Sequence, residues 1–364
     1  MQAVVLVGGK GTRLQPLTLT TPKPLVPLGN RPLVEHIVDW LSSHGVEEIL
    51  LLTQYRAADF EDWLASWKGT PVTAVEEPVP LGTAGAVANV ADWIRGTTAV
   101  INGDNITNLD LRAMAQAHYA AGAAATIAVD HVDDPTGRGV VLADRSGRVM
   151  RFQEKPAPGM ALASTVNTGS YLIEPRALAG LEQGRPAMWE TEVFPALIAS
   201  GAPVFAFAAP HLWLDAGTPA GYFAAQEAVL RGAASRPAGR DEGGRWTEAH
   251  VSVDASAGCS GPLAIGYGSI VAAGASVHGP ASVGRECHVL PGALVERSAI
   301  WDHCLLEPRS RIGGSILGYN CYIADGAIVE GALLGDGVIV RPGAYIPPGS
   351  RIAPGAIVEH RDAG

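Results

Sequence analysis

The stretch IGYGSIVAAGASVHGPASV, residues 265–283, carries an aliphatic residue at every sixth position, and this period governs the last third of the chain. The aliphatic track continues with three steps of five residues through Ile265, Val271, Val277, Val283, Val289, Val295, Ile300, Leu306, Ile312, Leu317, Ile323, Val329, Leu334, Val340, Ile346, Ile352 and Val358. A second track of small residues follows four places later at Ser269, Ala275, Ala281, Ala293, Ser310, Ala327, Ala344, Ser350 and Ala356. Two coupled tracks over this length indicate a structural repeat.

One large and one small inward residue per six-residue edge resembles the hexapeptide repeat of the left-handed parallel β-helix. Three such edges make one triangular coil in that fold, and stacked coils bury a continuous core. Residues 251–364 are therefore predicted to form a β-helix. Cys287, Cys304 and Cys321 fall on the small track three edges apart. We expect them to stack inside the prism as small core residues in preference to a metal site.

Histidines in the repeat region raise the question of a second activity, because hexapeptide acyltransferases use a histidine as base. The residues concerned are His278, His288 and His303. No acyl-donor motif accompanies them, and a lone histidine is more often structural. A structural role is therefore the favoured interpretation.

The residues before the repeat lose all periodicity. Residues 232–247, GAASRPAGRDEGGRWT, are rich in Gly, Ala, Arg and Pro. This composition is typical of a connecting segment. We predict a linker over residues 232–250.

Residues 1–231 alternate apolar strands with amphipathic helices. The expected strands are Ala3–Val7, Glu48–Leu52, Val72–Val75 and Thr98–Asn102, and two of the expected helices are Leu33–Ser43 and Asp59–Trp67. Alternation of this kind predicts an α/β domain with a Rossmann-like, mostly parallel sheet. Ligands bind at the carboxyl ends of such strands, where Gly8-Gly9 and Asn102-Gly103-Asp104 fall.

The composition and net charge of the chain argue against a disordered, a membrane-spanning or a nucleic-acid-binding protein. The chain has 364 residues, 47% hydrophobic and 17% charged, which is a folded composition. No basic signal-peptide start and no apolar run of about 18 residues occur, so we expect a cytoplasmic protein without a membrane partner. The four cysteines lack metal-ligand spacing. A net charge of −10 argues against nucleic acid as a partner.

The most specific motif is LVGGKGTRLQPLTLTTPKPLVPL, residues 6–28. Glycines directly after a strand let backbone N–H groups approach phosphate oxygens. The expected nucleotide contacts here are Leu6, Gly8, Gly9, Gly11 and Thr12. Arg13 adds a planar fork that suits phosphate, and Lys23 adds a second cation between two prolines.

This segment resembles the nucleotide-sugar pyrophosphorylases, and Leu6-Val7-Gly8-Gly9 looks most like the mannose-1-phosphate guanylyltransferases among them. The resemblance covers the whole chain, because many members also carry a C-terminal β-helix. It implies that the loop holds the nucleotide phosphates. It further implies that Arg13 steadies the leaving pyrophosphate and that Lys23 contacts phosphate during transfer.

Further segments fit the same resemblance in the expected order. They are the base-reading loop with Glu77, Leu81, Gly82 and Thr83, the metal-binding Asp104 after Gly103, the sugar-phosphate contacts Gly139, Glu154 and Lys155, the sugar-contact strand with Asn167 and Thr168, and the second metal-binding aspartate, Asp215. The implied catalytic residues are Arg13, Lys23, Asp104, Lys155 and Asp215. The implied cofactor is Mg²⁺, held by Asp104 and Asp215.

The implied reaction explains these residue types. A sugar-phosphate oxygen attacks the α-phosphorus of a nucleoside triphosphate in line, and pyrophosphate leaves. The nucleophile is already ionised, so catalysis consists of alignment and charge neutralisation. Two carboxylates are enough for Mg²⁺, which keeps several waters and binds phosphates.

One position departs from the family pattern. Arg138 stands before Gly139, where members often carry an aromatic residue. A cation near the sugar would favour an acidic or phosphorylated substrate, whereas a side chain pointing to solvent would have no such effect. The departure therefore bears on the sugar and not on the reaction.

Three functions compete. The first is transfer from GTP to mannose 1-phosphate or a related sugar 1-phosphate. The second is uridylyl or thymidylyl transfer to glucose 1-phosphate. The third is a non-catalytic sugar-nucleotide sensor or regulatory subunit, which the retained charged residues argue against. A β-helix also offers flat faces for association, so we expect a homo-oligomer assembled through this domain.

Overall fold

The computed structural model describes residues 1–359, and the chain divides into two compact units. The first unit contains Met1–Gly9 and Ile37–Trp213, and the second contains Lys10–His36 and the chain from Leu214 onward. This division differs from the expected boundary at residue 231, because the segment that carries Arg13 and Lys23 belongs with the C-terminal half.

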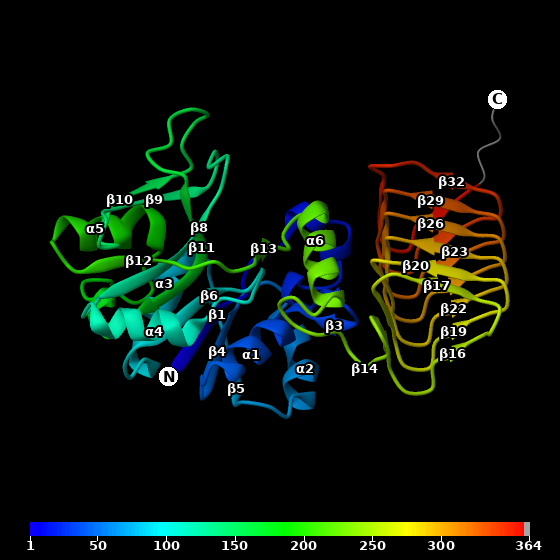
Figure 1. Cartoon of the computed structure of the whole chain (residues 1–364), viewed down its shortest axis with the longest axis horizontal. Helices are drawn as coiled ribbons and strands as arrows, with labels where there is room; N and C mark the ends of the chain where they lie inside the picture. The colour runs from blue at the N-terminus through cyan, green and yellow to red at the C-terminus, as the bar shows by residue number, and fades with distance from the viewer. Residues whose placement is uncertain (360–364) are drawn as a thin grey trace. The chain divides into compact units, whose positions relative to one another are not determined.

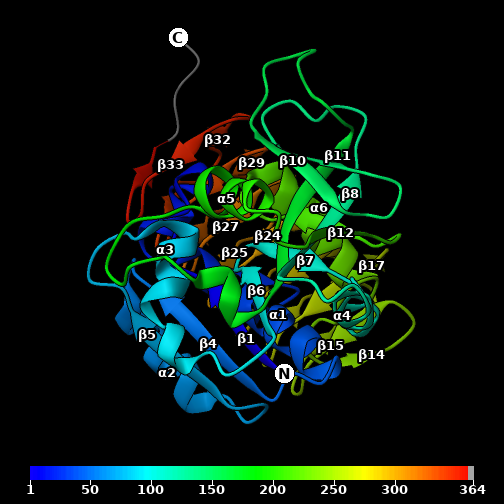
Figure 2. The same ribbon diagram turned by 90° about the vertical axis from the view of Figure 1, so that its left-hand side faces the viewer.

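The first unit is built on a nine-stranded sheet, in the order β10-β9-β11-β6-β1-β4-β5, with β8 paired to both β11 and β12. Its strands are β1 Gln2–Leu6, β4 Glu48–Thr53, β5 Val72–Glu76, β6 Thr98–Asn102, β8 Ala125–His131, β9 Gly139–Ala143, β10 Val149–Glu154, β11 Thr165–Ile173 and β12 Val204–Ala208. Strands β6, β1, β4 and β5 run parallel, and β11 is antiparallel to β6 (Figure 2). The predicted Rossmann-like sheet is confirmed.

Helices flank this sheet. They are α1 Leu33–Ser43, at the predicted bounds, α2 Phe60–Ser66, α3 Gly82–Asn89, α4 Leu111–Ala120 and α5 Phe194–Ala199. Helix α3 packs against β1, and α4 packs against β8 and β12. An aromatic cluster fills the core beside α5, where the ring centroids of Tyr171 and Trp189 lie 5.2 and 5.5 Å from that of Phe194.

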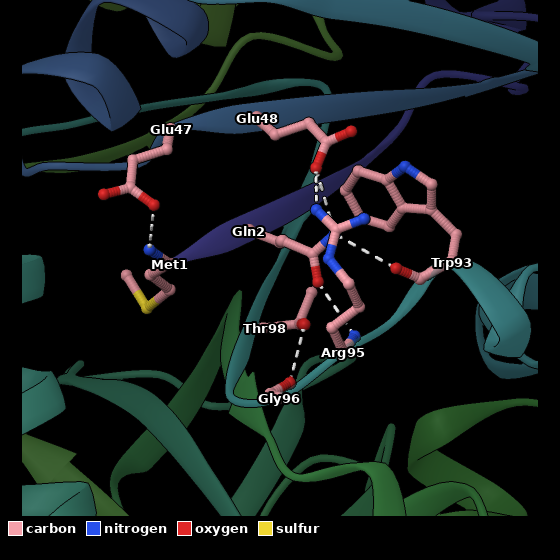
Figure 3. Close-up of polar contacts among 8 residues, drawn as sticks. All are labelled: Met1, Gln2, Glu47, Glu48, Trp93, Arg95, Gly96 and Thr98. Carbon is pink, nitrogen blue, oxygen red and sulfur yellow. Dashed lines mark hydrogen bonds and ion pairs between the residues drawn. The ribbon is translucent and has the colours of Figure 1, made fainter.

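A polar cluster ties together the amino ends of β1, β4 and β6 (Figure 3). The Gln2 side chain donates to Glu48 at 3.2 Å and to the Trp93 carbonyl at 3.0 Å, and Arg95 donates to the same Glu48 carboxylate. These contacts border an open cavity of about 530 Å³. The cluster lies at the opposite end of the strands from the predicted ligand edge, so its role in the fold is to hold the three strands in register.

The C-terminal part of the second unit is a left-handed parallel β-helix whose coils stack in three sheets (Figure 1). The first face contains β14 Arg240–Asp241, β15 Arg245–Thr247, β18 Leu263–Ile265, β21 Ala281–Val283, β24 Ala299–Ile300, β27 Ile316–Leu317, β30 Leu333–Leu334 and β33 Arg351–Ile352. The second contains β16 Ser252–Val253, β19 Ile270–Val271, β22 His288–Val289, β25 Leu305–Leu306, β28 Tyr322–Ile323, β31 Ile339–Val340 and β34 Ile357–Val358. The third contains β17 Gly258–Ser260, β20 Ser276–His278, β23 Leu294–Glu296, β26 Arg311–Gly313, β29 Ile328–Glu330 and β32 Tyr345–Ile346.

Both predicted tracks point into this β-helix. From Ile265 to Ile346 the aliphatic residues of the track are at most 2% exposed, and the small residues Ala275, Ala293 and Ala344 are equally buried. The cysteines stack as expected, since the Cys304 N–H lies 3.4 Å from the Cys287 sulfur. Each of the three thiols lies 3.0–3.3 Å from a carbonyl of the neighbouring coil. Burial raises the pKa of the Cys304 thiol well above its usual value.

The first face of the β-helix is covered by other parts of the second unit. Helix α6, Pro219–Leu230, contributes Gln226, which bonds to Ser282 at 3.1 Å, and Tyr222, which accepts from Trp301 at 3.4 Å. The same Tyr222 hydroxyl donates to the Pro27 carbonyl at 2.5 Å. The side chain of Asn30 donates to the Val283 carbonyl at 2.8 Å. These contacts place residues 10–36, α6 and the β-helix in one unit.

The linker prediction over residues 232–250 is wrong for residues 240–247. Strand β15 pairs in parallel with β18 on the first face of the β-helix. The reason is Trp246, which is buried against Leu230 and Ala264 and donates from its indole N–H to the Leu230 carbonyl at 3.0 Å. One tryptophan thus anchors a segment whose composition is that of a loop.

No helix among residues 1–359 has both the length and the apolar character required to cross a bilayer.

Candidate active site

The carboxyl ends of β1 and β6 meet at the glycines that the sequence singled out. The Gly103 N–H donates to the Leu6 carbonyl at 2.9 Å, and a Cβ on Gly103 would lie 2.6 Å from that oxygen. Only glycine therefore fits this crossing. Asp104 follows directly and is half-buried at the strand end. Around Gly9, no described atom lies within 4 Å of an added Cβ, which leaves open space beside the loop.

Glu77 faces the same loop. Its N–H donates to the Thr53 carbonyl at 2.8 Å, and its Oε2 lies 3.4 Å from the place that a Cβ of Gly8 would occupy. Its other oxygen, Oε1, is buried with no hydrogen-bond partner among residues 1–359. Burial raises the pKa of Glu77 to about 6. A buried acceptor without a partner is costly unless a ligand supplies the donor.

The expected base-reading loop leads into α3. Leu81 is buried. Gly82 has φ of 70°, and a Cβ on this residue would lie only 2.6 Å from the Ala187 carbonyl oxygen, so a larger residue does not fit. The Thr83 hydroxyl donates to Glu190 Oε2 at 3.4 Å. The start of α3 is thereby fixed by the segment around residue 188.

Glu190 is the residue that sequence reasoning missed. Its Oε1 accepts from the Tyr171 hydroxyl at 3.2 Å, and that hydroxyl accepts from Asn167 at 2.7 Å. Burial, with a smaller effect of the nearby Glu154 carboxylate, raises the pKa of Glu190. Glu190 lies on a π-helical turn, Trp189–Val193, a geometry frequent at functional sites but without a sequence signature.

The structure brings Asn167 into this network but turns Thr168 away from it. The Thr168 side chain is 1% exposed and donates to the Ala128 carbonyl at 2.9 Å. Its own carbonyl accepts from Asn105 at 2.6 Å. Thr168 therefore holds strand β11 in place, and its hydroxyl is already engaged.

The β9–β10 hairpin carries the expected sugar-phosphate contacts. Lys155 Nζ lies 3.1 Å from Glu154 Oε1, and Glu154 Oε2 lies 3.1 Å from the place of a Gly139 Cβ. Lys155 has φ of 44°, which is uncommon outside glycine. The Arg138 guanidinium stacks on the Trp213 ring, 5.3 Å from its centroid. Arg138 is thus held over an aromatic ring and extends the positive charge of the hairpin.

The second unit holds the other group of expected residues. Gly11 has φ of 61° and precedes the short 3₁₀ helix η1, Thr12–Leu14. A Cβ on Gly11 would lie 3.0 Å from both Lys23 Cβ and Thr18 Cγ2, and the Thr18 hydroxyl donates to the Gly11 carbonyl at 2.8 Å. The loop therefore folds closely over the segment that carries Lys23.

Three charged side chains converge around Gly217. Arg13 Nη2 lies 3.5 Å from Asp215 Oδ2, and Lys23 Nζ lies 3.8 Å from Asp215 Oδ1. A Cβ on Gly217 would lie 2.6 Å from the Asp215 oxygen, 2.6 Å from Lys23 Nζ and 2.7 Å from Arg13 Nη2. The Gly217 N–H donates to Asp215 Oδ1 at 2.7 Å. The missing side chain of Gly217 lets the two cations approach Asp215 closely, and a pair of neighbouring cations suits phosphate oxygens.

The chain resembles known proteins along most of its length. Residues 2–232 match the protein family described as nucleotidyl transferase. The chain is 34% identical over 311 residues to a mannose-1-phosphate guanylyltransferase of Mycobacterium tuberculosis, covering 84% of this chain and 81% of that protein. It is 30% identical over 355 residues to a UTP–glucose-1-phosphate uridylyltransferase of Synechocystis, covering 91% and 90%.

Among solved structures, HddC from Yersinia pseudotuberculosis complexed with GMP-PN is similar to part of this chain. The TM-score is 0.54 at 27% identity, covering 62% of this chain and 98% of that chain.

Proposed function

The chain belongs to the nucleotidyl transferase family, and from that premise we propose that it transfers GMP from GTP to mannose 1-phosphate or a related sugar 1-phosphate. The enzyme is a sugar-1-phosphate nucleotidyltransferase, which forms an NDP-sugar and pyrophosphate. The observation that carries the proposal is the convergence of Arg13, Lys23 and Asp215 at Gly217, within the segments that match the family.

In the proposed reaction an oxygen of the sugar phosphate forms a bond to the α-phosphorus of the triphosphate. The bond from that phosphorus to the bridging oxygen breaks, and pyrophosphate leaves with the electron pair. Arg13 and Lys23 neutralise charge on the phosphates, and Lys155 binds the phosphate of the sugar. Catalysis then rests on alignment and electrostatic stabilisation, without a general base.

Asp104 and Asp215 are the proposed Mg²⁺ ligands. Among residues 1–359 no cluster of three or more His, Cys, Asp or Glu side chains forms a complete metal cage. Mg²⁺ does not require one, because it binds one or two carboxylates and completes its shell with water and substrate phosphates. Hard carboxylate oxygens therefore fit this ion, which when bound neutralises phosphate charge.

Glu77 is the proposed reader of the base, with Leu81, Gly82 and Thr83 closing around it. Guanine presents two adjacent N–H donors on its pairing edge, which one carboxylate accepts together. The buried Glu77 Oε1, which lacks a partner within residues 1–359, supports this role. Uracil and thymine present a single N–H donor there and satisfy the carboxylate less well.

Glu154, Gly139 and Asn167 are proposed to contact the sugar. Glu154 accepts from sugar hydroxyls, and the missing Cβ of Gly139 leaves its carboxylate room to approach. Asn167 is held by the Tyr171 hydroxyl, so its amide is oriented before substrate binds. Thr168 is proposed to contact the sugar only through its backbone, because its hydroxyl already donates to the Ala128 carbonyl.

The test is pyrophosphate release with a panel of GTP, UTP, dTTP and ATP against mannose 1-phosphate, glucose 1-phosphate and related sugar phosphates. GTP with a manno-configured sugar phosphate is expected to give the highest kcat/KM. A preference for UTP or dTTP with glucose 1-phosphate would contradict the guanylyl assignment. Failure of every pair would contradict nucleotidyl transfer itself and favour a regulatory subunit.

We also propose a homo-oligomer that assembles through the second face of the β-helix. The outward positions of that face, from β19 to β34, are Ile270, His288, Leu305, Tyr322, Ile339 and Ile357, so an aliphatic or aromatic residue occupies five of these six positions. Ile270 and Ile357 are 38% and 51% exposed. Exposed apolar strips of this kind are typical of association surfaces.

Sedimentation of the full chain tests this proposal. We expect Leu305→Glu to dissociate the oligomer, while Ile328→Glu, at an outward position on the third face, leaves it intact. A monomeric full-length protein would refute the assembly.

A further inference from the structure

The segment that carries the phosphate-binding cations is attached to the β-helix along its first face. Asn30 bonds to the Val283 carbonyl of β21 at 2.8 Å, and Arg31 donates to the carbonyl of Arg236, in the segment before β14, at 3.2 Å. A second attachment to the first face lies far along it, at β33. There Arg351 donates from Nη2 to the Arg13 carbonyl at 3.1 Å and from Nη1 to the Gln15 carbonyl.

The two carbonyls that Arg351 binds stand at the carboxyl end of η1. In a 3₁₀ turn the carbonyl of residue i accepts from the N–H of residue i+3. Leu14 and Gln15 supply that donor to Gly11 and Thr12, at 2.9 and 3.2 Å. The corresponding donor for Arg13 would come from Pro16, which has no N–H. The guanidinium of Arg351 takes the place of the missing donor, and its fork geometry lets it bind a second carbonyl at the same time.

The position of the Arg13 side chain depends on this backbone. Its side chain is 60% exposed, so packing does not fix it, whereas that of Lys23 is 9% exposed. The ion pair of Arg13 with Asp215, at 3.5 Å, is the contact that remains, and exposed pairs of this kind are weak. At Gly217 the charged groups leave no room for even one carbon atom. A small shift of the turn would therefore move the guanidinium out of this arrangement.

We propose that Arg351 of the β-helix is a positioning residue for nucleotidyl transfer, which sets the Arg13 guanidinium by holding the backbone of its turn. This inference rests on the proposed function of Arg13. It makes the last coils of the repeat domain part of the catalytic machinery. Arg351 itself touches no reacting atom.

The test compares Arg351→Ala and Arg351→Lys with Arg341→Ala as the matched control. Arg341 directly follows strand β31 of the β-helix, and its side chain pairs on the surface with Glu359 at 3.7 Å. Arg351→Ala is expected to lower kcat about 10-fold or more, because displacement of a positioned group by about 1 Å can cost up to 10²-fold. The KM for the sugar phosphate should stay unchanged. Arg351→Lys should restore part of the rate, and Arg341→Ala should behave as wild type.

A double-mutant cycle separates positioning from simple stabilisation. If Arg351 acts through Arg13, its removal should cost less than 2-fold in an Arg13→Ala background. Equal costs in both backgrounds would overturn the proposal. So would a rate loss in Arg351→Ala that follows a lowered melting temperature and disappears on cooling the assay.

Hydrogen exchange gives a readout that does not depend on activity. Faster exchange of the Leu14 and Gln15 amides in Arg351→Ala than in Arg341→Ala would support the attachment even if the substrate panel refuted the proposed function. Unchanged exchange of these amides would overturn it. Failure of the inference and failure of the proposed function are thereby distinguishable.

Discussion

The second unit pairs its charged site residues with one another, whereas in the first unit one buried carboxylate oxygen has no hydrogen-bond partner in the described part of the chain. Arg13, Lys23 and Asp215 meet around Gly217, so this group is electrostatically organised before any phosphate arrives. Glu77 presents a buried oxygen that lacks a donor within residues 1–359. If these groups have their proposed roles, charge neutralisation is built into the fold, whereas base recognition is completed only when a ligand binds.

Gly217→Ala is the change with the largest expected effect on the preorganised group. The new Cβ would lie within 2.7 Å of three charged groups, which must separate to admit it. We expect kcat to fall by about 10³-fold, because the groups that are proposed to stabilise the transition state would be displaced together. Steady-state rates and melting temperature should be measured side by side.

Gly313→Ala is the control for this change, since no described atom lies within 4 Å of its Cβ position. A Gly217→Ala enzyme with a near-normal rate would show that the convergence around this glycine is not used in catalysis.

Asp104→Asn should have the next largest effect. Loss of one negative charge weakens the hold on Mg²⁺, and we expect turnover to fall by about 10²-fold with the fold intact. The Mg²⁺ concentration for half-maximal rate should rise as well. A folded variant with unchanged rate and unchanged Mg²⁺ dependence would remove this aspartate from the mechanism.

Glu77→Gln tests whether the Glu77 carboxylate reads the base. One acceptor of the proposed guanine pair becomes a donor, so the preference for GTP over UTP should fall by about 1–3 kcal/mol in kcat/KM. Glu76→Gln, at the neighbouring exposed position, is the control. An unchanged GTP preference would show that the base is read elsewhere.

The pH dependence of kcat/KM for GTP is a second test of the proposed role of Glu77. Since burial raises the pKa of Glu77 to about 6, the side chain is ionised above that pH and protonated below it. A protonated carboxyl cannot accept both guanine N–H groups, so kcat/KM for GTP should fall about tenfold per pH unit below 6. The decline should be absent in Glu77→Gln, and its persistence there would assign it to another group.

The smallest expected effect is on stability. A raised pKa means that the folded protein binds the proton more readily, so this contribution to stability is present at low pH and lost as pH rises from 4.5 through 6. Glu77→Gln should therefore melt about 1–3 °C higher than wild type at pH 8, with the difference shrinking toward pH 4.5. Thermal melts at both pH values check this, and a lower melting temperature at pH 8 would contradict it.

The β-helix could be predicted from the sequence because the pattern that specifies this fold is local. A β-helix needs one large and one small inward residue per edge, and that requirement recurs at a fixed spacing from Ile265 onward. The strands of the first unit and helix α1 follow from the same kind of short-range pattern. The prediction of a linker failed around Trp246, because the burial of this one aromatic residue outweighs the loop-like composition of its neighbours.

In the candidate site too, the residues that follow a local pattern could be predicted, and those that depend on distant contacts could not. Glycines at strand ends, such as Gly8 and Gly103, could be predicted, since polar motifs directly follow apolar strands. Glu190 could not, because its role depends on a π-helical turn and on hydrogen bonds to Thr83 and Tyr171 from other elements. Thr168 was predicted as a contact, but strand alternation alone does not say that its hydroxyl is engaged by Ala128.

The fold class of both halves, the repeat register and the order of the family motifs can be read from the chain alone, because each is encoded in neighbours a few residues apart. Three features follow only from packing between distant elements: Lys10–His36 belongs with the β-helix, three charges converge at Gly217, and Arg351 binds the backbone of the turn that carries Arg13. Arg351 and Gln15 are 336 residues apart. Contacts at that separation depend on how whole elements pack, and no local period records them.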